Sequence, residues 1–285
     1  MSQLVPGAVF LGSSVFPHYV TGGVPHWYCA MTILPWLFLL HRKSVADHRY
    51  VAAAAGAYAP VLCCGSLHHF VLFPVVFGLD AVLLALQRRG LRPLLTTAAW
   101  GVAGVALATV LVVPLLDLFR EFPRELPGLG RWMPLELLPG VLFSPDLPDL
   151  HGRTAGLLVF GGSAVYWVNC GAYIGLAAGL LALLGVVGAP RRTAALFLLT
   201  LGCTWLALGN GIRPSLWDAV HRLPVLSSMQ APERLMLLVV FGLALLAGAG
   251  FALVEQALAS RAGTWARVGS GALLAPGIVP LLVVN

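Results

Sequence analysis

The chain has 285 residues, of which 59% are hydrophobic and only 10% are charged, and its mean hydropathy is +0.89. A soluble domain ordinarily carries about 25% charged residues, so the composition excludes an ordinary soluble protein and predicts the lipid bilayer as partner. The net charge of +6 does not predict nucleic acid as a partner. The basic residues lie mainly between apolar runs, where they set the orientation of membrane proteins.

Eight apolar runs have about the 17 residues or more that a membrane-crossing helix needs. They cover residues 24–40, 51–67, 70–86, 94–116, 169–188, 193–209, 235–254 and 268–284. The second and third are short, and either form two short crossing helices or a broken re-entrant pair. The pattern predicts an all-α, polytopic transmembrane helix bundle with seven or eight spans, in a single transmembrane domain over residues 1–285.

The basic residues predict which side of the membrane each connection faces. Ten of the seventeen Lys and Arg lie in four short segments, 41–49, 87–93, 189–193 and 255–267. Short basic loops stay on the cytoplasmic side. The weakly structured segment 1–23 and the two long loops near 117–168 and 210–234 are therefore expected outside.

Candidate binding residues lie in these outer segments. Arg120, Arg222 and Arg234 suit a lipid-linked phosphate, because a guanidinium group offers planar, bidentate donors. They equally suit anchors at the membrane edge or partners of nearby carboxylates. His68 and His69, at the tip between the second and third runs, bind a phosphate, shuttle protons or cap two short helices.

Acidic residues are few, and three of them are candidates for a role. Asp117 and Glu233 lie nearest the membrane edge, where each could act as a base or pair with an arginine. Asp80 lies inside the third apolar run. An acid in a span costs about 2.5–3.5 kcal/mol on insertion scales, so Asp80 is either functional or an inward-facing contact between helices.

Established catalytic and cofactor motifs are missing from the sequence. It contains no HExxH, P-loop, GxSxG or Rossmann pattern. The five cysteines form no CxxC pair, and most lie in apolar runs, where free cysteine behaves as a small hydrophobic residue. The sequence therefore predicts no cofactor and no metal site, and it gives no support for a divalent metal.

Several tracts together are similar to a known family. They are Cys64-Gly65-Ser66-Leu67-His68-His69-Phe70, Gln87-Arg88-Arg89-Gly90-Leu91-Arg92-Pro93, Val113-Pro114-Leu115-Leu116-Asp117 with Arg120, and Met229-Gln230-Ala231-Pro232-Glu233-Arg234 followed by the helix 241–250. Over about residues 24–255 the chain resembles the bacterial YfhO-type membrane proteins of the GT-C glycosyltransferase class. The resemblance implies a GT-C-like fold and a multi-pass protein of the bacterial cytoplasmic (inner) membrane.

The resemblance also implies an activity, in which a sugar moves from a polyprenyl-phosphate donor to a cell-envelope acceptor on the outer face. Arg234 and Arg120 would contact the phosphate, with Arg222, His68 and His69 in reserve, while Asp117 and Glu233 are weaker candidates for the base. The family's usual base follows a preceding helix, and both are missing, so we expect an interior fragment.

Two alternatives stay open at this point. The first is a transporter or flippase for a lipid-linked substrate that uses Asp80, although we find no inverted repeat in the sequence. The second is a non-catalytic membrane subunit or remnant, which the missing acidic loop favours.

Overall fold

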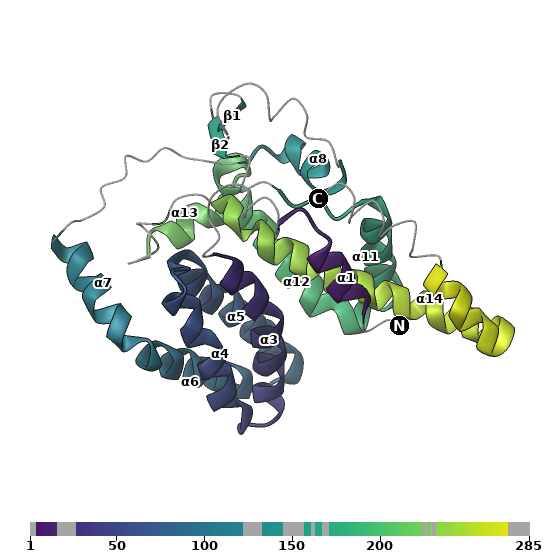
Figure 1. The fold of residues 1–285 in the computed structure, drawn as a ribbon, viewed down its shortest axis with the longest axis horizontal. Coiled ribbons are helices and arrows are strands. Elements are labelled where there is room, and N and C mark those ends of the chain that lie inside the picture. The colour runs from purple at the N-terminus through teal and green to yellow at the C-terminus, as the bar shows by residue number, and fades with distance from the viewer. Residues whose placement is uncertain are drawn as a thin grey trace. The chain divides into compact units, whose positions relative to one another are not determined.

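The computed structural model describes residues 4–15, 27–121, 133–144, 157–160, 163–166, 171–223, 226, 229 and 232–272. The chain divides into two compact units, each of which is described by itself. The first unit comprises residues 1–22, 130–219 and 230–285, and the second unit comprises residues 23–129 and 220–229. Apart from one short hairpin, the described elements are helices (Figure 1), which confirms the helical class predicted from the sequence.

The second unit is built from consecutive helices. These are α3 (Trp27–Ala46), α4 (Tyr50–Cys63), α5 (Leu67–Arg88), α6 (Arg92–Leu107) and α7 (Thr109–Glu121). The first four pack on one another and form the purple-to-blue bundle in Figure 1. Their connections have only three residues each, and such short links favour antiparallel neighbours. The predicted runs 51–67 and 70–86 correspond to α4 and α5, which are two separate helices.

Aromatic side chains fill the centre of this bundle. Tyr58 of α4 stacks on Phe70 of α5 with ring centroids 4.5 Å apart, and Trp100 of α6 meets Tyr58 and Phe77 edge-on at 5.4 and 5.6 Å. Aromatic pairs prefer these geometries. A Cβ atom on Gly104 would collide with the Tyr58 ring, so glycine at this position lets α4 and α6 approach closely.

The predicted span 94–116 is not one continuous helix. Helices α6 and α7 meet at a break near Ala108 and are bent by 77°. Pro114 lies inside α7, and because proline has no amide hydrogen it weakens the first turn of that helix. Helix α7 continues past the predicted end of the apolar run at residue 116, since Asp117 and Arg120 both belong to it.

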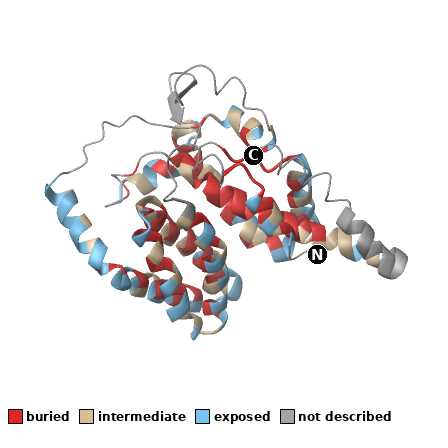
Figure 2. Cartoon of the chain, in the orientation of Figure 1, coloured by how far each residue is buried: buried red, intermediate tan, exposed pale blue. Residues whose placement is uncertain are grey.

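The first unit is organised around one long helix. Its elements are α1 (Val5–Leu11), η1 (Leu135–Leu137), α8 (Leu138–Phe143), β1 (Leu157–Phe160), β2 (Ser163–Tyr166), α11 (Leu176–Gly188), α12 (Pro190–Ala207), η2 (Gly209–Gly211), η4 (Pro232–Leu235) and α14 (Met236–Ala272). The strands pair antiparallel. Helix α13 (Leu216–His221) crosses the boundary between the units. Helices α1, α11 and α12 all pack on α14, along which Figure 2 shows a run of buried residues.

Glycines bring α11 and α14 into close contact. A Cβ atom on Gly250 would overlap the carbonyl oxygen of Leu181, and one on Gly185 would overlap that of Leu246. Both obstacles are backbone atoms of the facing helix, so no side chain can rotate away. Small residues at such crossings are typical of helix packing in membranes.

The expectation of a weakly structured segment 1–23 is wrong for its described part. Val5, Val9 and Phe10 of α1 are buried, and the Phe10 ring lies 5.3 Å from that of Phe241 in α14. Val5 and Val9 are four residues apart and therefore lie on one helical face. The glycines and serines of this segment suggest a polar loop, but its apolar side chains have the spacing of a packed helix.

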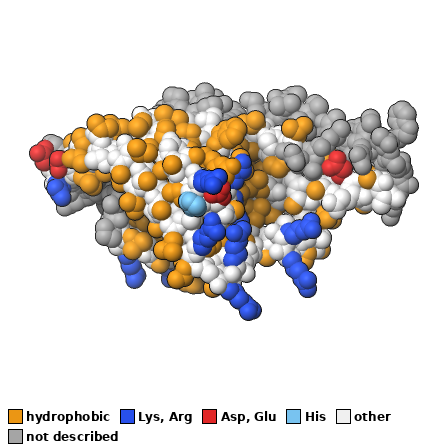
Figure 3. All heavy atoms as spheres, turned by 90° about the horizontal axis from the view of Figure 1, so that it is seen from below, with side chains coloured by type: hydrophobic (Ala, Val, Ile, Leu, Met, Phe, Trp, Pro, Cys, Tyr) orange, Lys and Arg blue, Asp and Glu red, His pale blue; other side chains and the backbone are white. Residues whose placement is uncertain are grey.

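Two helices are long and apolar enough to cross a membrane, Leu67–Arg88 and Pro232–Ser260, or three if the bent pair α6–α7 is one span. Helices α4 and α11 are shorter and apolar. Figure 3 shows hydrophobic side chains over much of one face, with basic side chains projecting from it. These features indicate a membrane protein. The count of seven or eight spans stays a prediction, and residues 273–284 of the eighth run lie outside the described residues.

Candidate functional site

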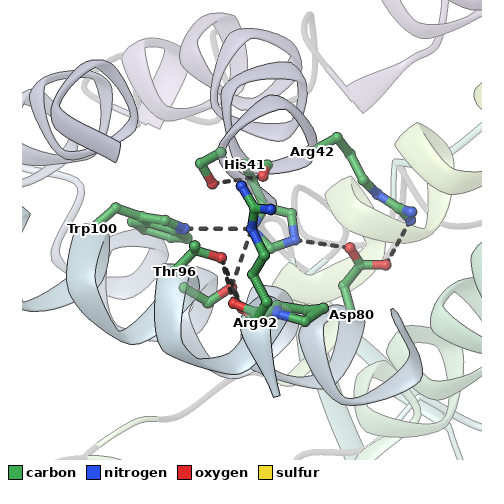
Figure 4. A network of polar contacts seen from close by, with 9 residues as sticks. His41, Arg42, Asp80, Arg92, Thr96 and Trp100 are labelled. Atoms are coloured by element: carbon green, nitrogen blue, oxygen red, sulfur yellow. Dashed lines mark hydrogen bonds and ion pairs between the residues drawn. The ribbon is translucent and has the colours of Figure 1, made fainter. Parts of the chain in front are cut away.

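A buried polar cluster joins three helices of the second unit (Figure 4). Asp80 of α5 accepts a hydrogen bond from Arg42 of α3 at 2.7 Å and contacts the His41 Nε2 atom at 2.9 Å. The Asp80 and His41 side chains are 0% exposed, whereas Arg42 is 28% exposed. Each carboxylate oxygen has its own nitrogen partner, so the acid predicted inside an apolar run lies in a paired environment.

Trp100 of α6 identifies the tautomer of His41. The indole Nε1 atom can only donate, and it lies 3.4 Å from His41 Nδ1. Nδ1 must therefore accept, which leaves Nε2 to carry the proton that faces Asp80. Thr97 also lies 3.4 Å from Nδ1, but its hydroxyl donates to the Pro93 carbonyl at 2.7 Å. The contacts thus describe an imidazole that bridges α6 and α5.

Neighbouring contacts fix the ends of the helices that carry the cluster. The Arg42 guanidinium lies 5.1 Å from the centre of the Phe38 ring, within the range of a cation–π contact. Arg92, in the first turn of α6, donates to the Ala46 carbonyl at the end of α3 at 2.7 Å. These contacts fix the position of α3 relative to α6. The cluster therefore links α3, α5 and α6 through specific side-chain contacts.

The predicted phosphate ligands of the second unit differ widely in their surroundings. Arg120 is 80% exposed and lies 3.5 Å from a carboxylate oxygen of Asp117, so the two form the kind of open ion pair that contributes about 0–1 kcal/mol. Arg222 is exposed and follows directly after the end of α13. His221 beside it contacts the Met229 carbonyl at 2.8 Å.

The histidines predicted at a hairpin tip are not at a tip. His68 and His69 belong to the first turn of α5, and His69 is buried with its ring 5.8 Å from that of Phe73. The turn between α4 and α5 is instead made by residues 64–66. A buried ring beside phenylalanine fits packing better than it fits a phosphate contact.

Glu233 and Arg234 share the short helix η4, which leads directly into α14. Glu233 is buried and Arg234 is half-buried, in contrast to the exposed Arg120. These two residues belong to the first unit, whereas Asp117, Arg120, Arg222, His68 and His69 belong to the second. Within each unit, the structure brings Asp117 to Arg120 and places Glu233 next to Arg234.

Sequence reasoning identified Asp80 but missed its partners. His41 and Arg42 looked like the basic end of a span, yet both lie inside α3 and reach Asp80. Asp80 lies about two helical turns before the basic end of α5, which places it near the depth at which the run 24–40 ends. An acid in a span needs a partner, so matching these depths could have found the pair.

Among the residues that the structure describes, no group of three or more His, Cys, Asp and Glu side chains could hold a metal ion. No protein-family description, no curated protein and no solved structure matches this chain.

Proposed function

We propose that this protein binds the phosphate of a polyprenyl-phosphate-linked sugar where α14 begins, as part of a GT-C-like glycosyltransferase of the bacterial cytoplasmic (inner) membrane. The observation that supports this most is the position of Arg234. It is half-buried in η4, at the start of the stretch Pro232–Ser260, which is long and apolar enough to cross a membrane.

The chemistry at this position favours an anion. The first turn of a helix carries a partial positive charge and unpaired amide groups. The guanidinium group of Arg234 adds planar donors that match phosphate oxygens. Glu233 is fully buried, so we assign it to holding the η4 turn rather than to deprotonating an acceptor that arrives from the outer face.

In the proposed reaction, a base removes the proton of the acceptor hydroxyl, and the acceptor oxygen bonds to the anomeric carbon of the sugar while the bond from that carbon to the lipid phosphate oxygen breaks. Negative charge grows on the departing polyprenyl phosphate. Arg234 stabilises that charge, and this stabilisation is the part of the reaction that we assign to this chain.

Arg234→Gln is expected to weaken binding of polyprenyl phosphate by about 10- to 100-fold, because a hydrogen bond to a charged group contributes about 1.5–3 kcal/mol. Arg234→Lys is expected to bind polyprenyl phosphate with an affinity between those of the wild type and Arg234→Gln. Lysine keeps the positive charge but lacks the planar, paired donors of arginine. Binding is measured on the full chain in lipid nanodiscs, with the uncharged polyprenol as the comparison ligand.

Arg192→Gln is the matched control. Arg192 is exposed in the first turn of α12, on the side that its basic segment predicts to be cytoplasmic. If Arg192→Gln weakens binding as much as Arg234→Gln, or if polyprenol binds as tightly as its phosphate, the proposed site is wrong.

A further inference from the structure

A groove of about 610 Å³ runs between α5 and α6 in the second unit, within the ~300–1,000 Å³ that ligand pockets occupy. Its lining is almost wholly apolar and includes Pro74, Gly78 and Ala81 from α5, and Gly101 and Val105 from α6. Trp100 and Thr97 also line the groove. Both side chains contact His41, so the groove adjoins the His41–Asp80 cluster.

The glycines of this groove keep space open rather than letting helices touch. A Cβ atom on Gly78 or Gly101 would meet nothing within 4 Å. Gly104, one turn beyond Gly101 on α6, is different, because a Cβ atom there would collide with Tyr58. The same helix thus uses glycine for close packing at Gly104 and leaves an unfilled hollow at Gly101.

Positive charge gathers at the turn that joins the two groove helices. Arg88 and Arg89 are exposed there, and Arg92 follows in the first turn of α6, two residues before the groove residue Leu94. No acidic residue occurs from position 81 to 116. The nearest one before the turn, Asp80, is engaged by His41 and Arg42.

We propose that the α5–α6 groove binds one hydrocarbon chain of an anionic phospholipid, with the lipid phosphate held by Arg88 and Arg89. The apolar hollow fits a hydrocarbon chain, and the exposed Arg88 and Arg89 fit a phosphate, which guanidinium groups bind through paired donors. Basic clusters at the cytoplasmic end of membrane helices commonly select anionic headgroups. This site is separate from the proposed Arg234 site and does not depend on it.

The headgroup half of the proposal is tested with phosphatidylglycerol and phosphatidylcholine vesicles. The full chain is purified in mild detergent, and lipid retained per protein is measured by native mass spectrometry. The wild-type protein is expected to retain phosphatidylglycerol in preference to phosphatidylcholine. Arg88→Gln/Arg89→Gln is expected to reduce that preference by about thirtyfold, as two surface arginines near anionic lipid predict.

The matched control is Arg191→Gln/Arg192→Gln, which removes the same charge from another exposed arginine pair beside a proline-led helix. It is expected to leave the lipid preference unchanged. An equal loss in this control would show diffuse surface attraction and would overturn the site. Displacement of the lipid by millimolar inorganic phosphate alone would also overturn it, because the hydrocarbon chain of the lipid would then contribute nothing to binding.

The part of the proposal that concerns the hydrocarbon chain is tested with Gly101→Leu, which places a bulky side chain in the groove at a position whose Cβ site is open. It is expected to reduce retention of phosphatidylglycerol and phosphatidylcholine alike by about tenfold, with circular dichroism unchanged. Gly56→Leu is the control, since Gly56 of α4 also has nothing within 4 Å of its Cβ position and lies outside the groove. Retention that is unchanged in Gly101→Leu, or reduced equally in Gly56→Leu, would overturn the proposal.

Discussion

Asp80→Ala is expected to lower the free energy of unfolding by about 3 kcal/mol, because removing one partner of a buried ion pair strands the other charge. Arg42 would keep its charge in a mostly buried place, and His41 Nε2 would lose its acceptor. The measurement is thermal unfolding of the purified chain in detergent, monitored through the reactivity of cysteines that become exposed as the protein unfolds. Cys29 of α3 is half-buried in the same unit as Asp80, which makes it a suitable reporter.

The double variant Arg42→Met/Asp80→Leu is the control for this prediction. It removes both charges and keeps apolar volume, and such exchanges of buried pairs are often neutral or stabilising. We expect its unfolding temperature to return most of the way to that of the wild type. If the double variant is as unstable as Asp80→Ala, stability depends on side-chain shape rather than on the stranded charge, and the explanation by charge pairing is wrong.

Gly250→Val is expected to separate α11 from α14 and to destabilise the first unit by about 3 kcal/mol, at the upper end for overpacked cores. Any side chain at this position meets the Leu181 carbonyl and the Gly185 amide. Because both are backbone groups, relief requires movement of a whole helix. The variant is expected to elute as aggregate in size-exclusion chromatography.

Gly56→Val provides the comparison for Gly250→Val. Both positions are helical glycines, so the two variants change backbone freedom in the same way, but the Cβ position at Gly56 is open. We expect Gly56→Val to elute as wild type. If both variants aggregate equally, the cause is valine within a membrane helix rather than the contact between α11 and α14.

Much of the helical framework could be predicted from the sequence, because apolar runs and basic ends are local signals. The run 70–86 and its basic end correspond closely to α5. The break near Ala108 was missed, since a run of apolar residues looks the same whether it is straight or bent by 77°. Helix α1 was missed because its burial comes from α14, more than 200 residues along the chain.

The polar cluster shows why a site is harder to predict than a framework. His41 and Asp80 are 39 residues apart and lie on different helices, so no local pattern pairs them. The opposite error occurred at His68 and His69, where two adjacent polar residues suggested an exposed tip but His69 is buried. Arg234 could be selected from the sequence by its place before an apolar run, and the described structure adds that it is half-buried.

The bend at Ala108 has a consequence for how the chain leaves the bilayer. If α6 stands upright in the membrane, a helix bent by 77° runs nearly parallel to the membrane plane. The exposed apolar side chains Val110, Val113 and Leu116 would then rest in the headgroup layer, as interfacial helices do. Arg120 would lie flat among lipid phosphates instead of extending into water. A lipid diffusing within the same leaflet would then meet Arg120 from the side.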